Sequence, residues 1–72
     1  MKNKNFQSVE IGHIYERRDG QKAVVFNYDV IHDWYDCVIL GTTSFFSVHE
    51  DGLYLESKES HNDLIFDYNI TN

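Results

Sequence analysis

The chain contains a single cysteine, Cys37, among its 72 residues. One cysteine excludes an internal disulfide and a four-cysteine zinc site, which makes the cytoplasm the default expectation for location. The sequence has no apolar run of about 18 residues, so a transmembrane helix is excluded. No apolar segment follows the polar start Met1–Asn5, and we therefore expect no signal peptide.

Basic residues are also scarce, since 6 lysines and arginines stand against 12 aspartates and glutamates, for a net charge of −6. Residues 1–22 carry a balance of +2, whereas residues 23–72 carry nine carboxylates against Lys58 alone. An acidic surface repels phosphate backbones, so we expect no direct nucleic-acid binding. The same surface favours a partner with a basic surface, although an acidic charge also serves solubility by itself.

The chain does contain enough apolar material for a small core. It is 42 % hydrophobic and 15 % aromatic, with five Phe, five Tyr and one Trp. Aromatic side chains bury the largest areas of any residue type, so a single compact domain is expected. We assign this domain to residues 9–68, with a flexible N-terminal arm at 1–8 and a frayed C-terminus at 69–72.

Apolar residues alternate with polar ones at the two-residue period of strands, and no window keeps a helical period. Asp-Gly pairs at positions 19–20 and 51–52 separate such runs. This pair predicts tight hairpins whose type I′ turns have positive φ at both central residues. The continuous apolar run Cys37–Leu40 predicts a strand that is covered on both faces, and the polar segment Asp29–Asp36 predicts a bend. Phe45–His49 is expected to form the first strand of the second hairpin, and Leu53–Leu55 its return. The pattern predicts an all-β fold, a five-stranded antiparallel SH3-like barrel with two Asp-Gly hairpins.

Three phrases of the sequence resemble short proteins encoded by tailed phages and prophages, most of which have no assigned function. They read IGHIYERRDGQKAV at Ile11–Val24, EDGLY at Glu50–Tyr54 and SHNDLI at Ser60–Ile65. The resemblance covers Val9–Tyr68, and Tyr28–Asp36 departs from it by being longer and more acidic. It implies a phage accessory protein with an SH3-like β-fold, and it carries over no catalytic residue.

Residues that could support catalysis or metal binding do not form a recognisable motif. The histidines at positions 13, 32, 49 and 61 lack the spacing of a chelating pair. Cys37 opens the most apolar run of the chain, where a cysteine usually acts as a small hydrophobe. Paired carboxylates such as Glu50 and Asp51 are typical of a solvated acidic face. We therefore expect no enzymatic activity, no metal and no cofactor.

The strongest candidate for recognition is Tyr28–Asp36, which mixes aromatic and acidic side chains. Tryptophan and tyrosine are common hot-spot residues of interfaces, and the acids between them would meet arginines or lysines. The opposing interpretation is that Trp34 plugs an open end of the barrel. A peptide groove, or a methyl-lysine cage built from Trp34, Tyr35 and Tyr54, is a further alternative. The predicted binding residues are Asp29, Asp33, Trp34, Tyr35, Asp36, Glu50 and Asp51.

These observations predict a non-enzymatic phage or mobile-element protein that binds a host protein in the bacterial cytoplasm. A more specific version of this prediction is that the protein inhibits a defence system, as an inhibitor of the anti-CRISPR or anti-restriction type. The carboxylates of the inhibitor would occupy a basic nucleic-acid channel as a nucleic-acid mimic. We expect no membrane association and a monomer or homodimer, since a small sheet has exposed edges.

Two alternatives come from other classes of function. An oligomeric sponge would trap a small nucleotide signal between protomers, and Arg17, Arg18 and Lys22 are the candidate phosphate contacts. The competing interpretation of these three residues is a solvated hairpin tip. The second alternative is a structural or assembly role in the virion.

Overall fold

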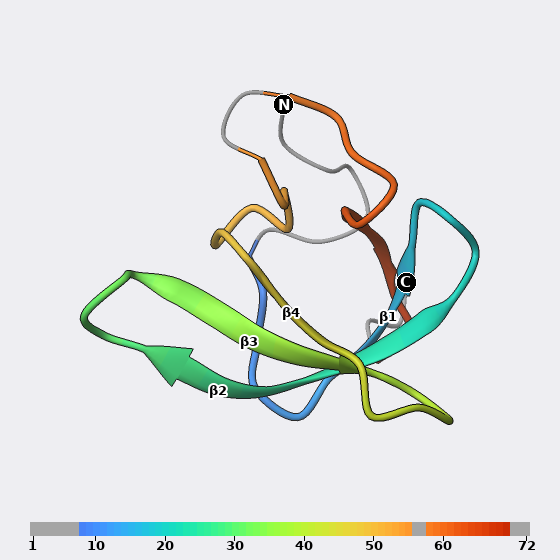
Figure 1. The fold of residues 1–72 in the computed structure, drawn as a ribbon, viewed down its shortest axis with the longest axis horizontal. Coiled ribbons are helices and arrows are strands. Elements are labelled where there is room, and N and C mark those ends of the chain that lie inside the picture. Colours follow the sequence, from blue (N-terminus) through green and yellow to red (C-terminus); the bar gives the residue numbers. More distant parts are fainter. Residues whose placement is uncertain (1–7, 56–57, 70–72) are drawn as a thin grey trace.

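The computed structural model describes residues 8–55 and 58–69. They form a single antiparallel sheet in the order β4-β3-β2-β1-β5 (Figure 1). Its strands are β1 (Ile14–Arg17), β2 (Lys22–Asp29), β3 (Trp34–Ile39), β4 (Phe45–Val48) and β5 (Leu64–Asp67). The prediction of an all-β fold with five antiparallel strands is confirmed. Within the described residues the ladder ends at β4 and β5, so the closure of a barrel stays a prediction.

The predicted arm and the predicted frayed end fall largely on residues 1–7 and 70–72, which lie outside the described residues. The described ranges contain no helix long and apolar enough to cross a membrane.

The turn between β1 and β2 differs from the predicted type I′ geometry. Gly20 has a φ of +92°, and its N–H donates to the Arg17 carbonyl at 2.9 Å. Asp19 does not share the positive φ, because Asp33 is the one described non-glycine residue with that conformation. The Asp19 carboxylate instead accepts the Gln21 N–H at 3.0 Å, which fixes the turn without a left-handed Asp19.

The predicted bend at Asp29–Asp36 is narrower than expected, because Asp29 ends one strand, Trp34–Asp36 begin the next, and only residues 30–33 form the turn. β2 extends to Asp29 and β3 begins at Trp34, and the two residues face each other in the ladder. The connection closes where the Asp33 N–H donates to the Asp29 carbonyl at 2.8 Å, with Asp33 at φ 58°. Figure 1 shows this hairpin projecting beyond the rest of the sheet, which explains why its strands tolerate polar residues.

A β-bulge in β2 exchanges the faces of the strand. The ladder pairs Val25 with Cys37 and then Asn27 with Asp36, which leaves Phe26 as the extra residue. Val25 is buried before the bulge, whereas Tyr28 after it shares a face with Tyr35. Simple alternation along β2 would place Phe26 and Tyr28 on one face with Val24, and this alternation fails at the bulge.

The core lies between the sheet and the connection from β4 to β5, which arches over one side of it (Figure 1). Tyr15 is fully buried, and its hydroxyl accepts the Glu10 N–H at 2.8 Å. Leu53 from the connection is buried as well. The buried apolar residues are Val9, Tyr15, Ala23, Val25, Cys37, Val48, Leu53 and Leu64.

Leu53–Leu55 does not form the predicted strand beside β4. The hairpin starts as expected, since the His49 N–H donates to the Leu53 carbonyl at 2.9 Å. The residues on either side of Leu53 bond towards β5: the Gly52 carbonyl accepts the Leu64 N–H, and the Tyr54 N–H donates to the Asp63 carboxylate, both at 2.9 Å. These contacts take the main chain of the segment away from β4.

Candidate functional site

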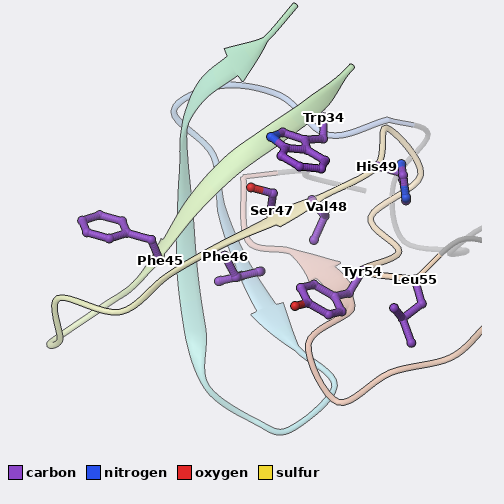
Figure 2. A pocket seen from close by; sticks show the side chains of 8 residues that line it. All are labelled: Trp34, Phe45, Phe46, Ser47, Val48, His49, Tyr54 and Leu55. Carbon is purple, nitrogen blue, oxygen red and sulfur yellow. The ribbon is translucent and has the colours of Figure 1, made fainter. Parts of the chain in front are cut away.

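A groove lies along the outer edge of β4, where the second hairpin opens. Its cavity measures about 370 Å³. Figure 2 shows Trp34 and Ser47 on one side of the strand, with Phe46, Tyr54 and Leu55 on the other. The groove therefore wraps around an edge strand and presents side chains from both of its faces. Its lining residues are Trp34, Phe45, Phe46, Ser47, Val48, His49, Tyr54 and Leu55.

The main chain of β4 faces this groove at two residues. The Ile39 N–H donates to the Ser44 carbonyl, so this pair is hydrogen-bonded within the sheet. Hydrogen-bonded and non-hydrogen-bonded pairs alternate along an antiparallel ladder. Phe45 and Ser47, opposite Val38 and Asp36, are then non-hydrogen-bonded, and their N–H and C=O groups point outward from the sheet. The edge ends at His49, whose N–H is bonded to Leu53.

Trp34 stands at the upper wall of the groove and is held by the turn before it. Its indole stacks on the His32 ring, with 4.4 Å between centroids and 9° between planes. Asp29 fixes His32, because its carboxylate accepts from the His32 N–H at 3.2 Å and contacts Nδ1 at 2.9 Å. The hydrogen bond from His32 lowers the pKa of Asp29. Asp29 therefore supports the position of Trp34 through the turn.

Asp33, Tyr28 and Tyr35 form a second cluster on the hairpin. The Tyr28 hydroxyl donates to the Asp33 carboxylate, and the Tyr28 and Tyr35 rings lie 4.9 Å apart. The hydrogen bond to Asp33 raises the pKa of Tyr28 to about 12, and burial and the charges of Asp33, Tyr35 and Glu50 add to the shift. Glu50 thus acts on the same cluster from the turn that follows β4. Tyr35 packs against the core and does not line the groove.

Asp36 lies directly behind the groove wall. Its carboxylate accepts from the Ser47 hydroxyl at 2.7 Å and from the Asn27 amide at 3.0 Å. Asp51 is used within its own turn, where its carboxylate accepts the Leu53 N–H at 3.0 Å. Of the seven predicted binding residues, only Trp34 lines the groove. Asp36 contacts the lining residue Ser47, and Asp33 and Glu50 are the chain neighbours of the lining residues Trp34 and His49.

Sequence reasoning missed Asp63, the buried residue that holds the lower wall of the groove. Its side chain is fully buried, and its carboxylate accepts the Tyr54 N–H at 2.9 Å and the Ser60 N–H at 2.8 Å. Arg18 completes this site with an ion pair at 3.1 Å. Asp63 stands between the polar Asn62 and the apolar Leu64 in the sequence, and no local signal distinguishes it from a strand-end acid.

The candidate phosphate residues are engaged with different partners. Arg17 is 5 % exposed, donates to Asp19 at 2.7 Å and to Asn62, and lies 4.7 Å above the Phe46 ring. Arg18 pairs with Asp63, and the Lys22 ammonium lies 5.5 Å from the centre of the Tyr68 ring. A phosphate clamp stays a prediction, and it would require both arginines to leave their present partners.

Cys37 is fully buried in the core. Burial, with the charge of Asp36, raises the pKa of its thiol to about 12, so the thiolate is unfavourable at neutral pH. Among residues 8–55 and 58–69, no group of three His, Cys, Asp or Glu side chains has the geometry of a metal site.

Comparisons with protein-family models, with curated proteins and with solved structures found no match to this chain.

Proposed function

We propose that this protein is a non-enzymatic binding module. Its β4 groove, together with the acidic residues beside the groove, binds a basic surface of a partner protein. The observation that carries the proposal is the placement of Trp34 in a groove whose lining residue Ser47 is bonded to the Asp36 carboxylate, with the acids at positions 33 and 50 next in the chain to the lining residues Trp34 and His49. Aromatic side chains in a recess supply most of the energy of an interface, and the surrounding charges steer the partner.

The partner we propose is a host protein of the bacterial cytoplasm, and the effect is inhibition of a defence system. Two observations support this finer form: the resemblance of the sequence to phage proteins and the balance of −8 in residues 23–72. Carboxylates on such a surface would compete with nucleic acid for a basic channel by charge. We further propose an SH3-like barrel, supported by the return of β5 to pair with β1 and by the bulge that bends β2.

The test is capture of partners from a bacterial lysate, with identification by mass spectrometry at low and at high salt. We expect one host protein or complex at low salt and its loss at high salt, because surface charges are screened over about 8–10 Å at moderate ionic strength. Retention of phage structural proteins alone would instead favour the virion role, and a co-purifying nucleotide would favour the sponge.

Two variants test whether the partner binds at the groove. Glu50→Lys should lower the affinity at low salt by roughly tenfold, and Trp34→Ala should lower it at both salt concentrations. Glu59→Lys is the matched control, because the exposed Glu59 lines a different recess with Arg18, Ser60 and His61. Equal losses for Glu50→Lys and Glu59→Lys would show that net charge alone governs binding, and would contradict the proposed site.

A further inference from the structure

The outer edge of β4 lacks the strand that the sequence pattern places beside it. The pattern pairs Phe45–His49 with Leu53–Leu55, but only the His49–Leu53 bond next to the turn joins them. Gly52 and Tyr54 bond to the β5 side instead, at Leu64 and Asp63. The result is a strand with four outward main-chain groups, the N–H and C=O of Phe45 and Ser47, facing a groove of about 370 Å³.

We infer that this groove binds by strand addition: an extended basic segment of the partner pairs with the main chain of Phe45 and Ser47. The inference rests on the proposed function and names the form of its ligand. An edge strand offers main-chain hydrogen bonds to any extended chain, and side-chain recesses on its two faces select the sequence.

The two faces of β4 predict a ligand in which apolar and basic side chains alternate along the chain. Successive side chains of an added strand point to opposite faces. One set meets Phe46, Tyr54 and Leu55, where Tyr54 and Leu55 are 38 % and 44 % exposed, and this set should be apolar. The other set lies on the face of Ser47 and Trp34, next to the Asp36 carboxylate, and this set should be basic.

Charge decides between a partner segment and a second copy of this chain. A second copy that paired through β4 would bring its own carboxylates at 33, 36 and 50 towards the same acids. The eight residues that line the groove include no lysine and no arginine to offset them. A basic segment meets complementary charge at the same place, so the occupant is a partner and not a second protomer.

The test uses the full chain and a synthetic library of end-blocked octapeptides. These carry Lys or Arg at odd positions and Val, Leu or Tyr at even positions. The tightest-binding peptide is then made in two N-methylated forms, methylated at odd or at even residues. An added strand uses every second N–H to pair with β4, so one form should lose at least about tenfold in affinity and the other should retain it. Equal affinities of the two forms, or no selected peptide, would overturn the inference.

Ser47→Pro tests the protein side of the contact. It removes an outward N–H while leaving the β3 ladder its donors, and proline is tolerated on such an edge. We expect loss of the peptide, whereas Thr43→Pro in the exposed turn before β4 should retain it. The N-methylated peptides on the unaltered chain keep the test valid if Ser47→Pro unfolds.

Two further outcomes separate the inference from the proposed function. A host protein retained by Ser47→Pro but lost by Glu50→Lys would overturn strand addition and leave the proposed function standing. A dimer of the unaltered chain in sedimentation, made monomeric by Ser47→Pro, would overturn it too, because a second copy would then occupy the edge.

Discussion

At the scale of single residues, the groove depends on a carboxylate that lies beneath it. Asp63 is fully buried and accepts the main-chain N–H groups of Tyr54 and Ser60 while pairing with Arg18. Removal of one partner from a buried, charged hydrogen-bond network leaves the others unsatisfied, and that cost exceeds the cost of losing a surface contact. The lower wall of the groove is thus positioned from the core.

We predict that Asp63→Asn lowers the free energy of unfolding by about 2–4 kcal/mol, because the amide cannot replace both carboxylate oxygens as acceptors. Denaturant titration measures the change. Asp33→Asn is the matched control: Asp33 is exposed, and asparagine tolerates its positive φ, so it should cost under about 1 kcal/mol. Similar losses in the two variants would contradict the central role of Asp63.

At the scale of elements, the first turn is set by one glycine. Gly20 has a φ of +92°, and a Cβ at this position would meet nothing within 4 Å. The cost of a side chain there comes from the backbone conformation alone.

Gly20→Ala should therefore destabilise the protein by about 1–2 kcal/mol, and Gly20→Asn by less, because asparagine enters the left-handed region more easily. Thermal unfolding followed by circular dichroism measures both. An alanine variant as stable as the original would show that the turn changes type to relieve the strain.

The strand elements were predictable only where the local pattern agrees with the pairing. Ile14–Arg17 and Phe45–Val48 alternate simply, and both form strands as expected. The segment Trp34–Asp36 was too polar to be read as a strand, although the ladder with β2 and the hydrogen bonds of Asp36 to Asn27 and Ser47 stabilise it there. The bulge at Phe26 has no signal in the sequence, since it belongs to the pairing of β2 with β3.

At the scale of the whole molecule, the burial of ionisable groups in so small a core makes the stability of the fold sensitive to pH in the alkaline range. Burial raises the pKa of Cys37 to about 12 from an ordinary value of 9.0, and burial also raises the pKa of Tyr15. Between pH 9 and about pH 12, the folded chain keeps the proton on the Cys37 thiol, whereas the unfolded chain releases it. The contribution of this proton to the free energy of unfolding is therefore fully present below about pH 9, and it is lost as the pH rises above that value.

We predict that replacing Cys37 by alanine flattens this decline by at most about 1.4 kcal/mol per pH unit between pH 9 and 12. Denaturant titrations at pH 7, 9 and 10.5 measure the slope, and a comparison of slopes cancels the constant cost of the cavity that alanine leaves. Identical slopes in the two proteins would show that Cys37 does not titrate with unfolding.

The sequence by itself determined the all-β class, the turn glycines and the acidic charge, because these follow from a period of two, a positive φ and a count of carboxylates. It also singled out Trp34, the largest aromatic of the acidic hairpin. Only the tertiary structure decided that Leu53–Leu55 leaves β4 and opens a groove. The partners that draw this segment away, Asp63 and Leu64, lie about ten residues further along the chain, and local patterns do not encode contacts of that range.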